Sequence, residues 1–247
     1  MAKKILILNG SAKKEKSTTM DVTRAFVKGM TSDGDYTAET VNVTDLDIKP
    51  CMGCLSCCSK SQGECIINGD DVKSVRDKIE DSDVVIMSFP LYFFGLPGKL
   101  KMLVDRLLGM LNEYRGQDPD DVTGSLHGFR HPKEGQKLIL ISGCAWTDTD
   151  TVYESIVKQF DMICGKGNYD TIWCPQLKTL SNQGMRPRFV RYLANFEAAG
   201  KEYGQTLKIS EETRSKISRL AYSESVYKEL LASYWDQERE DGKKLGY

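Results

Sequence analysis

Histidine is nearly absent from this sequence, and its scarcity excludes several kinds of catalytic site. The 247 residues include only two histidines, His127 and His131. No Ser-His-Asp or Cys-His arrangement for nucleophilic catalysis is therefore visible. The spacing of four would place both imidazoles on one face of a helix, but Gly128 and Pro132 break a helix there, which argues against a metal pair.

An excess of charge of either sign is also absent. Lysine and arginine total 34 and aspartate and glutamate total 35, which gives a formal charge of −1. This balance indicates neither a nucleic-acid-binding surface nor a patch for anionic membranes. It points to a small molecule as the partner.

Long apolar runs are missing as well. No stretch approaches the roughly 18 consecutive apolar residues of a membrane helix, and the short apolar run at residues 5–8 lacks the cleavage site of a secretion signal. We therefore expect a cytoplasmic protein that does not enter a membrane. Eight cysteines in that setting indicate metal or redox chemistry rather than disulfide bonds.

Five of those cysteines lie within CMGCLSCCSKSQGEC, which is the most informative part of the chain. Cys51, Cys54 and Cys57 form a CxxCxxC pattern. Cys65 follows after a longer gap, and Cys58 is a fifth sulfur. Short CxxC steps let thiolates converge on one point, which is the geometry that iron–sulfur clusters need. Zinc, free thiols and disulfide-forming thiols are the alternatives that these residues leave open.

Short apolar runs alternate with helical patterns along the first 175 residues. The runs predict strands at Lys3–Leu8, Asp83–Ser88, Lys137–Ser142 and Tyr169–Cys174, and an alternating pattern predicts a less buried strand at Tyr36–Val43. Apolar spacing predicts helices at about Thr18–Met30, Val72–Ile79, Gly98–Leu111, Phe189–Leu207 and Ile217–Trp235. This alternation predicts an α/β fold with a parallel sheet, whose ligands bind at the carboxyl ends of the strands.

The pattern divides the chain into two parts. Residues 1–175 are the predicted α/β domain, with a cysteine-rich insert at 50–69. Residues 176–247 are a predicted C-terminal helical extension that packs on the domain or on a second subunit. The stretch 115–135 interrupts the alternation and is interpreted as a solvated excursion that could cover the pocket.

The loop after the first predicted strand suits a phosphate group. It carries hydroxyl groups at Ser11, Ser17, Thr18 and Thr19 beside a predicted helix start, where backbone amides and the helix dipole favour an anion. The loop comes close to a Walker A motif, but Glu15 stands where that motif requires glycine. The phosphate of a flavin mononucleotide is therefore the better match. An ordinary capping loop is the alternative.

Two further loops place aromatic and small residues at strand ends. Residues 88–98, SFPLYFFGLPG, follow the third strand, and residues 143–146, GCAW, follow the fourth. Aromatic residues at the carboxyl end of a strand suit a flat, partly apolar ring such as isoalloxazine. A subunit interface is the alternative interpretation, and both can hold.

Three motifs, taken in order, resemble those of a known family. They are GSxxxxxST after the first strand, PCMGCLSC with a later cysteine, and SFPLYFFGLPGKLKMLVDR after the third strand. Over about residues 3–175 the chain resembles the flavodoxin-like NADPH-dependent FMN reductases, and among them the iron–sulfur flavoproteins. The resemblance implies a doubly wound, five-stranded parallel sheet in the order 2-1-3-4-5.

The resemblance also implies roles for individual residues. FMN phosphate would be bound by Ser11, Ser17, Thr18 and Thr19. The flavin ring would contact Pro90, Leu91, Tyr92, Phe93, Phe94, Gly95, Gly143, Cys144 and Ala145. A [4Fe–4S] cluster would be bound by Cys51, Cys54, Cys57 and Cys65. Cys58 has no role in this pattern.

The sequence thus predicts an FMN-dependent NAD(P)H oxidoreductase in which the flavin, rather than a side chain, carries the chemistry. Electrons would pass from the nicotinamide through the flavin, and through a cluster if one is present, to a small-molecule or protein acceptor. A cluster-free quinone, azo or nitro reductase is one alternative. A non-enzymatic electron carrier of flavodoxin type is another, but it would be expected to be strongly acidic. The wide apolar stripe at 99–111 predicts a homodimer or homotetramer.

Overall fold

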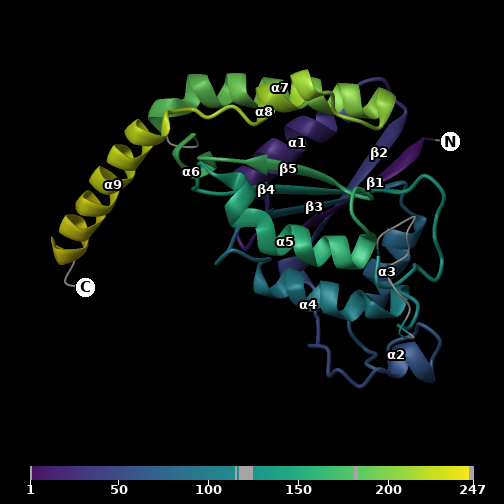
Figure 1. The fold of residues 1–247 in the computed structure, drawn as a ribbon. Coiled ribbons are helices and arrows are strands. Elements are labelled where there is room, and N and C mark those ends of the chain that lie inside the picture. Colours follow the sequence, from purple (N-terminus) through teal and green to yellow (C-terminus); the bar gives the residue numbers. More distant parts are fainter. Residues whose placement is uncertain (1, 115, 117–124, 181–182, 245–247) are drawn as a thin grey trace.

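The computed structural model describes residues 2–114, 116, 125–180 and 183–244. Its centre is a five-stranded parallel sheet in the order β2-β1-β3-β4-β5, which confirms the predicted topology (Figure 1). The strands are β1 Lys3–Asn9, β2 Tyr36–Asn42, β3 Val84–Pro90, β4 Lys137–Gly143 and β5 Asp170–Cys174. Residues 115 and 117–124 of the predicted excursion lie outside the described residues.

The composition of the strands explains their order from the centre to the edge of the sheet. β3 and β4 are rich in Val, Ile and Leu, and each pairs in parallel with a strand on both sides. β2 pairs only with β1, and its Thr and Glu side chains leave most of it exposed. Continuous apolar runs are typical of parallel strands that are covered by helices on both faces.

Helices cover both faces of the sheet. They are α1 Thr18–Met30, α2 Ser56–Ser59, α3 Val72–Asp81, α4 Gly98–Arg106, α5 Thr149–Cys164, α6 Leu177–Leu180, α7 Arg186–Thr206, α8 Glu211–Ile217 and α9 Glu224–Lys244. Short 3-10 turns are η1 Lys14–Lys16, η2 Val43–Asp45, η3 Leu107–Met110 and η4 Gln183–Met185. α1, α7 and α8 lie on one side of the sheet, and α3, α4 and α5 lie on the other (Figure 1). The buried side chains form two clusters, one on each side.

The helix predicted over 217–235 is wrong, because α8 ends at Ile217 and α9 begins only at Glu224. The buried side chain of Gln176 explains the break. Its Oε1 accepts hydrogen bonds from the amides of Ala221 and Tyr222, and its Nε2 donates to the carbonyl of Tyr222. Hydrogen bonds to the Gln176 side chain thus replace the backbone hydrogen bonds of a continuous helix at residues 221 and 222.

Two other helices differ from the prediction. The one predicted over 98–111 ends as an α-helix at Arg106 and continues as the 3-10 turn η3. No helix is predicted at residues 149–164, where α5 lies. Its start nevertheless has a recognisable signal, because the carboxylate of Asp148 accepts from the amide of Thr151 at 3.1 Å.

α7 shares the core of the sheet domain. Its Phe196 and Tyr203 are buried together with Phe26 of α1. Gly200 allows this close approach, because a Cβ atom there would lie 1.8 Å from the carbonyl oxygen of Phe26. The domain division at residue 175 stays a prediction.

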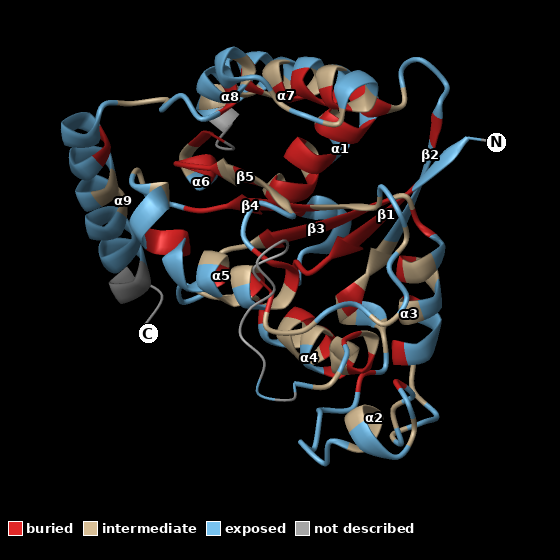
Figure 2. Ribbon diagram, turned by 45° about the vertical axis from the view of Figure 1, so that its right-hand side comes forward, coloured by how far each residue is buried: buried red, intermediate tan, exposed pale blue. Residues whose placement is uncertain are grey.

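α9 differs from the other long helices, because it extends from one end of the molecule and is mostly exposed (Figures 1 and 2). Among its described side chains, Tyr227 is buried, whereas Val226, Leu230 and Trp235 are exposed. In the part of the chain that the structure describes, no helix has both the length and the apolar content needed to cross a membrane.

Candidate functional site

The structure brings the three predicted loops together at the carboxyl edge of the sheet. The amide of Gly10, after β1, donates to the carbonyl of Ser88 in β3 at 2.9 Å, and the amide of Leu91 donates to the carbonyl of Gly143 at 3.1 Å. Thr19 lies beside Gly143, since a Cβ atom on that glycine would be 3.1 Å from the Thr19 hydroxyl oxygen. The site therefore forms where the strand order reverses, as in other open α/β sheets.

The first loop ends at the N-terminus of α1 with polar groups available. Ser17 precedes the helix, and its hydroxyl makes no capping hydrogen bond to the first turn. Ser11, Ser17 and Thr19 are buried, and Thr18 is half-buried. First-turn amides that no side chain caps, together with the dipole of a 13-residue helix, favour an anion at this position.

Asn9 shapes this loop, and the sequence patterns did not single it out. Its Oδ1 accepts from the amide of Ser11 at 3.0 Å, and its Nδ2 donates to the side chain of Asn42 at 2.9 Å. The available signal was a polar residue at the end of an apolar strand, and in the structure this residue is fully buried. Asn9 thus fixes the turn that leads to the hydroxyl groups.

Glu15 departs from the Walker A pattern, and the structure shows where its carboxylate lies. Arg24 of α1 donates to Glu15 Oε2 at 2.9 Å and to the Glu15 carbonyl at 3.0 Å. The same guanidinium donates to Asp21 at 2.6 Å. An arginine thus neutralises the carboxylate next to the candidate phosphate loop.

The second loop is a tight turn with unusual backbone angles. Tyr92 and Gly95 exchange backbone hydrogen bonds, and the two residues between them, Phe93 and Phe94, have φ of +48° and +62°. This left-handed conformation normally requires glycine or asparagine and costs about 1–3 kcal/mol per residue when a bulky side chain adopts it. This turn presents two aromatic rings to solvent, because Phe93 is 99% and Phe94 is 45% exposed.

The third loop completes an aromatic border. The ring of Trp146 lies 5.7 Å from that of Phe94, and both rings are partly exposed. Gly143 and Cys144 are buried, whereas Ala145 is exposed. Burial raises the pKa of the Cys144 thiol, so that this cysteine is not an activated nucleophile. Of the predicted ring contacts, Pro90 and Leu91 are half-buried next to this border.

The cysteine segment, residues 50–69, lies in the connection between β2 and α3 and includes α2 (Figure 1). Cys51 and Cys54 are exposed, while Cys57, Cys58 and Cys65 are half-buried. The Cys57 and Cys58 sulfurs are 4.0 Å apart. Within the described residues, no three His, Cys, Asp or Glu side chains are grouped closely enough to hold a metal ion.

The protonation preferences of the cysteine thiols differ. Hydrogen bonds from the backbone and the hydroxyl of Ser56 lower the pKa of Cys54. Burial, together with the neighbouring Cys58 and Cys65, raises the pKa of Cys57 to about 11. Cys54 therefore forms a thiolate more readily than Cys57.

Buried charge fixes the cysteine segment to the domain. Arg106, at the end of α4, donates to Asp70 Oδ2 at 2.6 Å, and the two side chains are only 1% and 2% exposed. Asp70 also accepts from the amide of Val72 at the start of α3. Burial opposes the ionised carboxylate, but the hydrogen bonds from Arg106, Lys49 and Val72 hold the pKa of Asp70 below its usual value.

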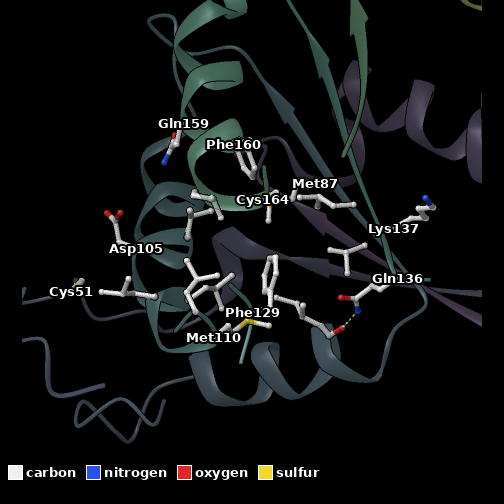
Figure 3. A pocket seen from close by; sticks show the side chains of 18 of the residues that line it. Cys51, Met87, Asp105, Met110, Phe129, Gln136, Lys137, Gln159, Phe160 and Cys164 are labelled. Carbon is white, nitrogen blue, oxygen red and sulfur yellow. Dashed lines mark hydrogen bonds between the residues drawn. The ribbon is translucent and has the colours of Figure 1, made fainter. Parts of the chain in front are cut away.

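A cavity of about 470 Å³, separate from the three loops at the strand ends, lies between α4 and α5 (Figure 3). Its walls are mainly apolar, with Met87, Met110, Phe129 and Phe160 among them, and Cys51 stands at its rim. None of the residues predicted to bind FMN lines it. Cys51 and Gly53 of the cysteine segment thus line the same cavity as Val104 and Asp105 of α4.

Comparison with known proteins relates this geometry to two groups. A family model described as a flavodoxin-like fold matches residues 3–141. An iron–sulfur flavoprotein of Methanocaldococcus jannaschii is 36% identical over 103 residues, which are 42% of this chain and 51% of that protein. The chain thus spans about half the length of the curated relatives that it matches first.

Solved structures resemble the whole fold at lower sequence identity. An NAD(P)H:quinone oxidoreductase from Methanothermobacter marburgensis superposes with a TM-score of 0.60 at 18% identity, over 84% of this chain and all of the other. An FMN-dependent NADH-azoreductase from Bacillus anthracis, solved with FMN, has a TM-score of 0.57 at 17% identity, over 83% of this chain and 99% of the other. At such identities the likeness shows the fold.

The strained aromatic turn makes a prediction about stability. We expect Phe93→Gly to raise the free energy of unfolding by about 1 kcal/mol, because glycine adopts the left-handed conformation without strain and the ring that is lost is 99% exposed. Urea unfolding followed by circular dichroism measures the change. Phe93→Ala is the control, since it removes the ring but keeps the Cβ atom. An equal gain in both variants would contradict the strain argument.

The buried ion pair makes a prediction about acid stability. We expect Asp70→Asn to lower the free energy of unfolding by about 3–5 kcal/mol at pH 7, because it leaves the buried Arg106 charge uncompensated. The depressed pKa means that the carboxylate stabilises the fold fully above about pH 4 and loses this effect as the pH falls through its folded-state pKa. The difference in the free energy of unfolding between Asp70→Asn and the unmodified protein should therefore become smaller in acid.

Urea titrations at pH 7 and at about pH 3 test both parts of this expectation. Asp77→Asn is the control on α3, because Asp77 pairs with Lys73 in an exposed position and should change stability by less than about 0.5 kcal/mol. If Asp70→Asn loses no more stability than the control, or if its loss of stability grows in acid, the Asp70 carboxylate does not stabilise the fold through Arg106.

Proposed function

The chain belongs to the family of proteins with a flavodoxin-like fold, and on that premise we propose that it is an FMN-dependent NAD(P)H oxidoreductase. The relation to FMN reductases and iron–sulfur flavoproteins, expected from the motifs, is confirmed by the family match and the curated relatives. The observation that carries the proposal is the meeting of an uncapped helix N-terminus with a border of exposed aromatic rings at the strand ends.

FMN supplies the redox chemistry when it is bound, because its ring accepts a hydride from a nicotinamide and gives up electrons singly or in pairs. The protein's own contribution is binding and orientation. Ser11, Ser17, Thr18 and Thr19 would hold the phosphate through hydroxyls and first-turn amides. This requires no charged side chain, because the helix N-terminus already favours an anion.

The flavin ring would lie against the second and third loops. The turn at residues 90–95 offers backbone amides and exposed aromatic rings, while residues 143–145 offer small side chains that let a planar ring approach the backbone. Trp146 would form a further wall. Water is kept from one side of such a ring by the aromatic border, and the open side is left for the nicotinamide and for the acceptor.

For the cysteines we propose a [4Fe–4S] cluster bound by Cys51, Cys54, Cys57 and Cys65. The chemistry of the donor set supports it, since four thiols lie within one tightly turned segment. The relatives named iron–sulfur flavoproteins support it as well. The cluster would pass single electrons between the flavin and a protein or small-molecule acceptor.

One observation favours a second candidate. Cys51 lies at the rim of the apolar cavity, whereas Cys57 and Cys58 lie together on the other part of the segment. A cluster-free reductase of quinones, azo compounds or nitro compounds would need no convergence of these thiols. Under either proposal, the exposed aromatic turn and the apolar side of α4 would be covered in a homodimer or homotetramer.

Nicotinamide oxidation tests the function as a whole. The purified protein, loaded with FMN, should oxidise NADH or NADPH steadily when a quinone or free flavin is the acceptor. An electron carrier of flavodoxin type would show almost no turnover. A protein that stays colourless after incubation with FMN would end the proposal.

The phosphate site makes a prediction that separates FMN from riboflavin. We expect Ser17→Asp to weaken FMN binding about a hundredfold or more, because its carboxylate repels the phosphate at short range. Riboflavin lacks the phosphate, so its affinity should change little. The fold should persist, since aspartate is a favourable residue before a helix.

Fluorescence quenching titrations with both flavins measure these affinities. Ser32→Asp adds the same charge beyond the other end of α1 and is the control for net charge. Equal losses for FMN and riboflavin in Ser17→Asp would place the phosphate elsewhere.

The cysteines make a prediction about metal content. Protein purified without oxygen should contain about four irons and four sulfides per chain, as a [4Fe–4S] cluster requires. Cys54→Ser should lose them, and Cys58→Ser should keep them. Iron and sulfide assays, with zinc measured in parallel, decide between a cluster, zinc and free thiols. Retention of iron in Cys54→Ser would remove that residue from the ligand set.

A further inference from the structure

Arg106 holds both ends of the cysteine segment. Its Nη1 donates to the carbonyl of Lys49 at 2.7 Å, and its Nη2 donates to the carbonyl of Ile67 at 3.0 Å. These two carbonyls lie on opposite sides of the cysteines in the sequence. Since Asp70 also binds the guanidinium, a single buried side chain closes the segment into a loop against the end of α4.

One donor of this guanidinium has no acceptor. The Nε atom of Arg106 is buried and forms no hydrogen bond with the described residues. Cys65 and Arg106 line the same small pocket, where the thiol interacts with the guanidinium. A buried N–H without an acceptor costs about as much as a lost hydrogen bond, so Arg106 retains an unused donor in the neighbourhood of Cys65.

Arg130 repeats this arrangement on the other side of the segment. Its Nη2 donates to the carbonyl of Cys57 at 3.5 Å and to Glu113 at 3.1 Å. Its Nε atom is also buried without a hydrogen bond. Arg106 and Arg130 therefore each keep an unused N–H donor while they contact the segment that holds Cys57 and Cys65, two of the proposed cluster ligands.

Backbone packing holds the same segment in place between these arginines. A Cβ atom on Gly109 of η3 would lie 2.0 Å from the carbonyl oxygen of Gly63, so the backbones of these two segments are in direct contact. Arg76 of α3 donates to that same carbonyl at 2.7 Å. The half-buried end of the segment is thus packed against α3 and η3, whereas Cys51 and Cys54 remain exposed.

We propose that Arg106 is a positioning residue of the cysteine site, which fixes the segment to α4 and donates its Nε–H to the sulfur of Cys65 when that sulfur is a metal-bound thiolate. The inference deepens the proposed function and rests on it. Hydrogen bonds to cluster sulfurs stabilise the reduced, more negative state and raise the reduction potential. Because α4 begins directly after the aromatic turn, the same helix connects the proposed flavin and cluster sites.

Arg106→Lys tests this role with the least damage. Lysine keeps the positive charge beside Asp70 but lacks the Nε–H and the second Nη group. The double variant Arg106→Met/Asp70→Leu is the second test, because replacement of both members of a buried ion pair by apolar residues is often neutral for stability. Arg76→Lys is the control, since Arg76 contacts the segment through the carbonyl of Gly63.

The measurements are iron and sulfide per bound FMN, the midpoint potential of the cluster, and the rate at which trypsin cleaves metal-free protein at the exposed Lys60. In Arg106→Lys we expect cleavage to be at least about tenfold faster. We expect the reduction equilibrium to shift about tenfold toward the oxidised state, or about 59 mV for one electron. FMN content should stay unchanged. Arg76→Lys should leave the potential unchanged.

Two results separate the failure of this inference from that of the proposed function. If the unmodified protein holds FMN but no iron or sulfide, the cluster fails and donation to Cys65 fails with it, and the trypsin rates still decide whether Arg106 positions the segment. If Arg106→Lys matches the unmodified protein in iron content, potential and trypsin resistance, the role of Arg106 is overturned while the cluster stands.

Discussion

Parallel pairing of β1 with β3 is the constraint on which the candidate site depends. Because β2 lies outside β1, the chain leaves β1 toward α1 on one face of the sheet and leaves β3 toward α4 on the other. The two connections diverge and leave a crevice at the carboxyl edge, where open α/β sheets bind ligands. The hydrogen bond from Gly10 to Ser88 fixes the spacing of its two walls.

α4 relates this crevice to the cysteine segment. A nine-residue helix is about 13 Å long, and its two ends differ in character. Its first residue follows a strained aromatic turn, and its last residue forms a buried ion pair with Asp70. A buried ion pair is weak evidence of stability, because desolvation offsets the attraction between the charges. Here its evident effect is on position, since the same guanidinium also binds the carbonyls on either side of the cysteines.

Local patterns predicted some parts of the structure better than others. The five strands were found to within one or two residues, because β1, β3 and β4 are runs of apolar residues and β2 alternates polar with apolar residues. The break between α8 and α9 was missed, because it depends on Gln176, which is 45 residues away from Ala221 along the chain. The left-handed angles at Phe93 and Phe94 were also missed, because aromatic residues carry no signal for that conformation.

The sequence by itself determined the fold class, the strand ends and the kinds of chemical group near them: hydroxyls after β1, aromatic rings after β3 and thiols after β2. Only the tertiary structure decided which of these groups meet. It placed Trp146 against Phe94, Arg106 beside Cys65, and Cys51 at the rim of an apolar cavity. The physical reason is that a strand or helix follows from spacing over a few residues, whereas contacts between distant residues follow from the close packing of the whole chain.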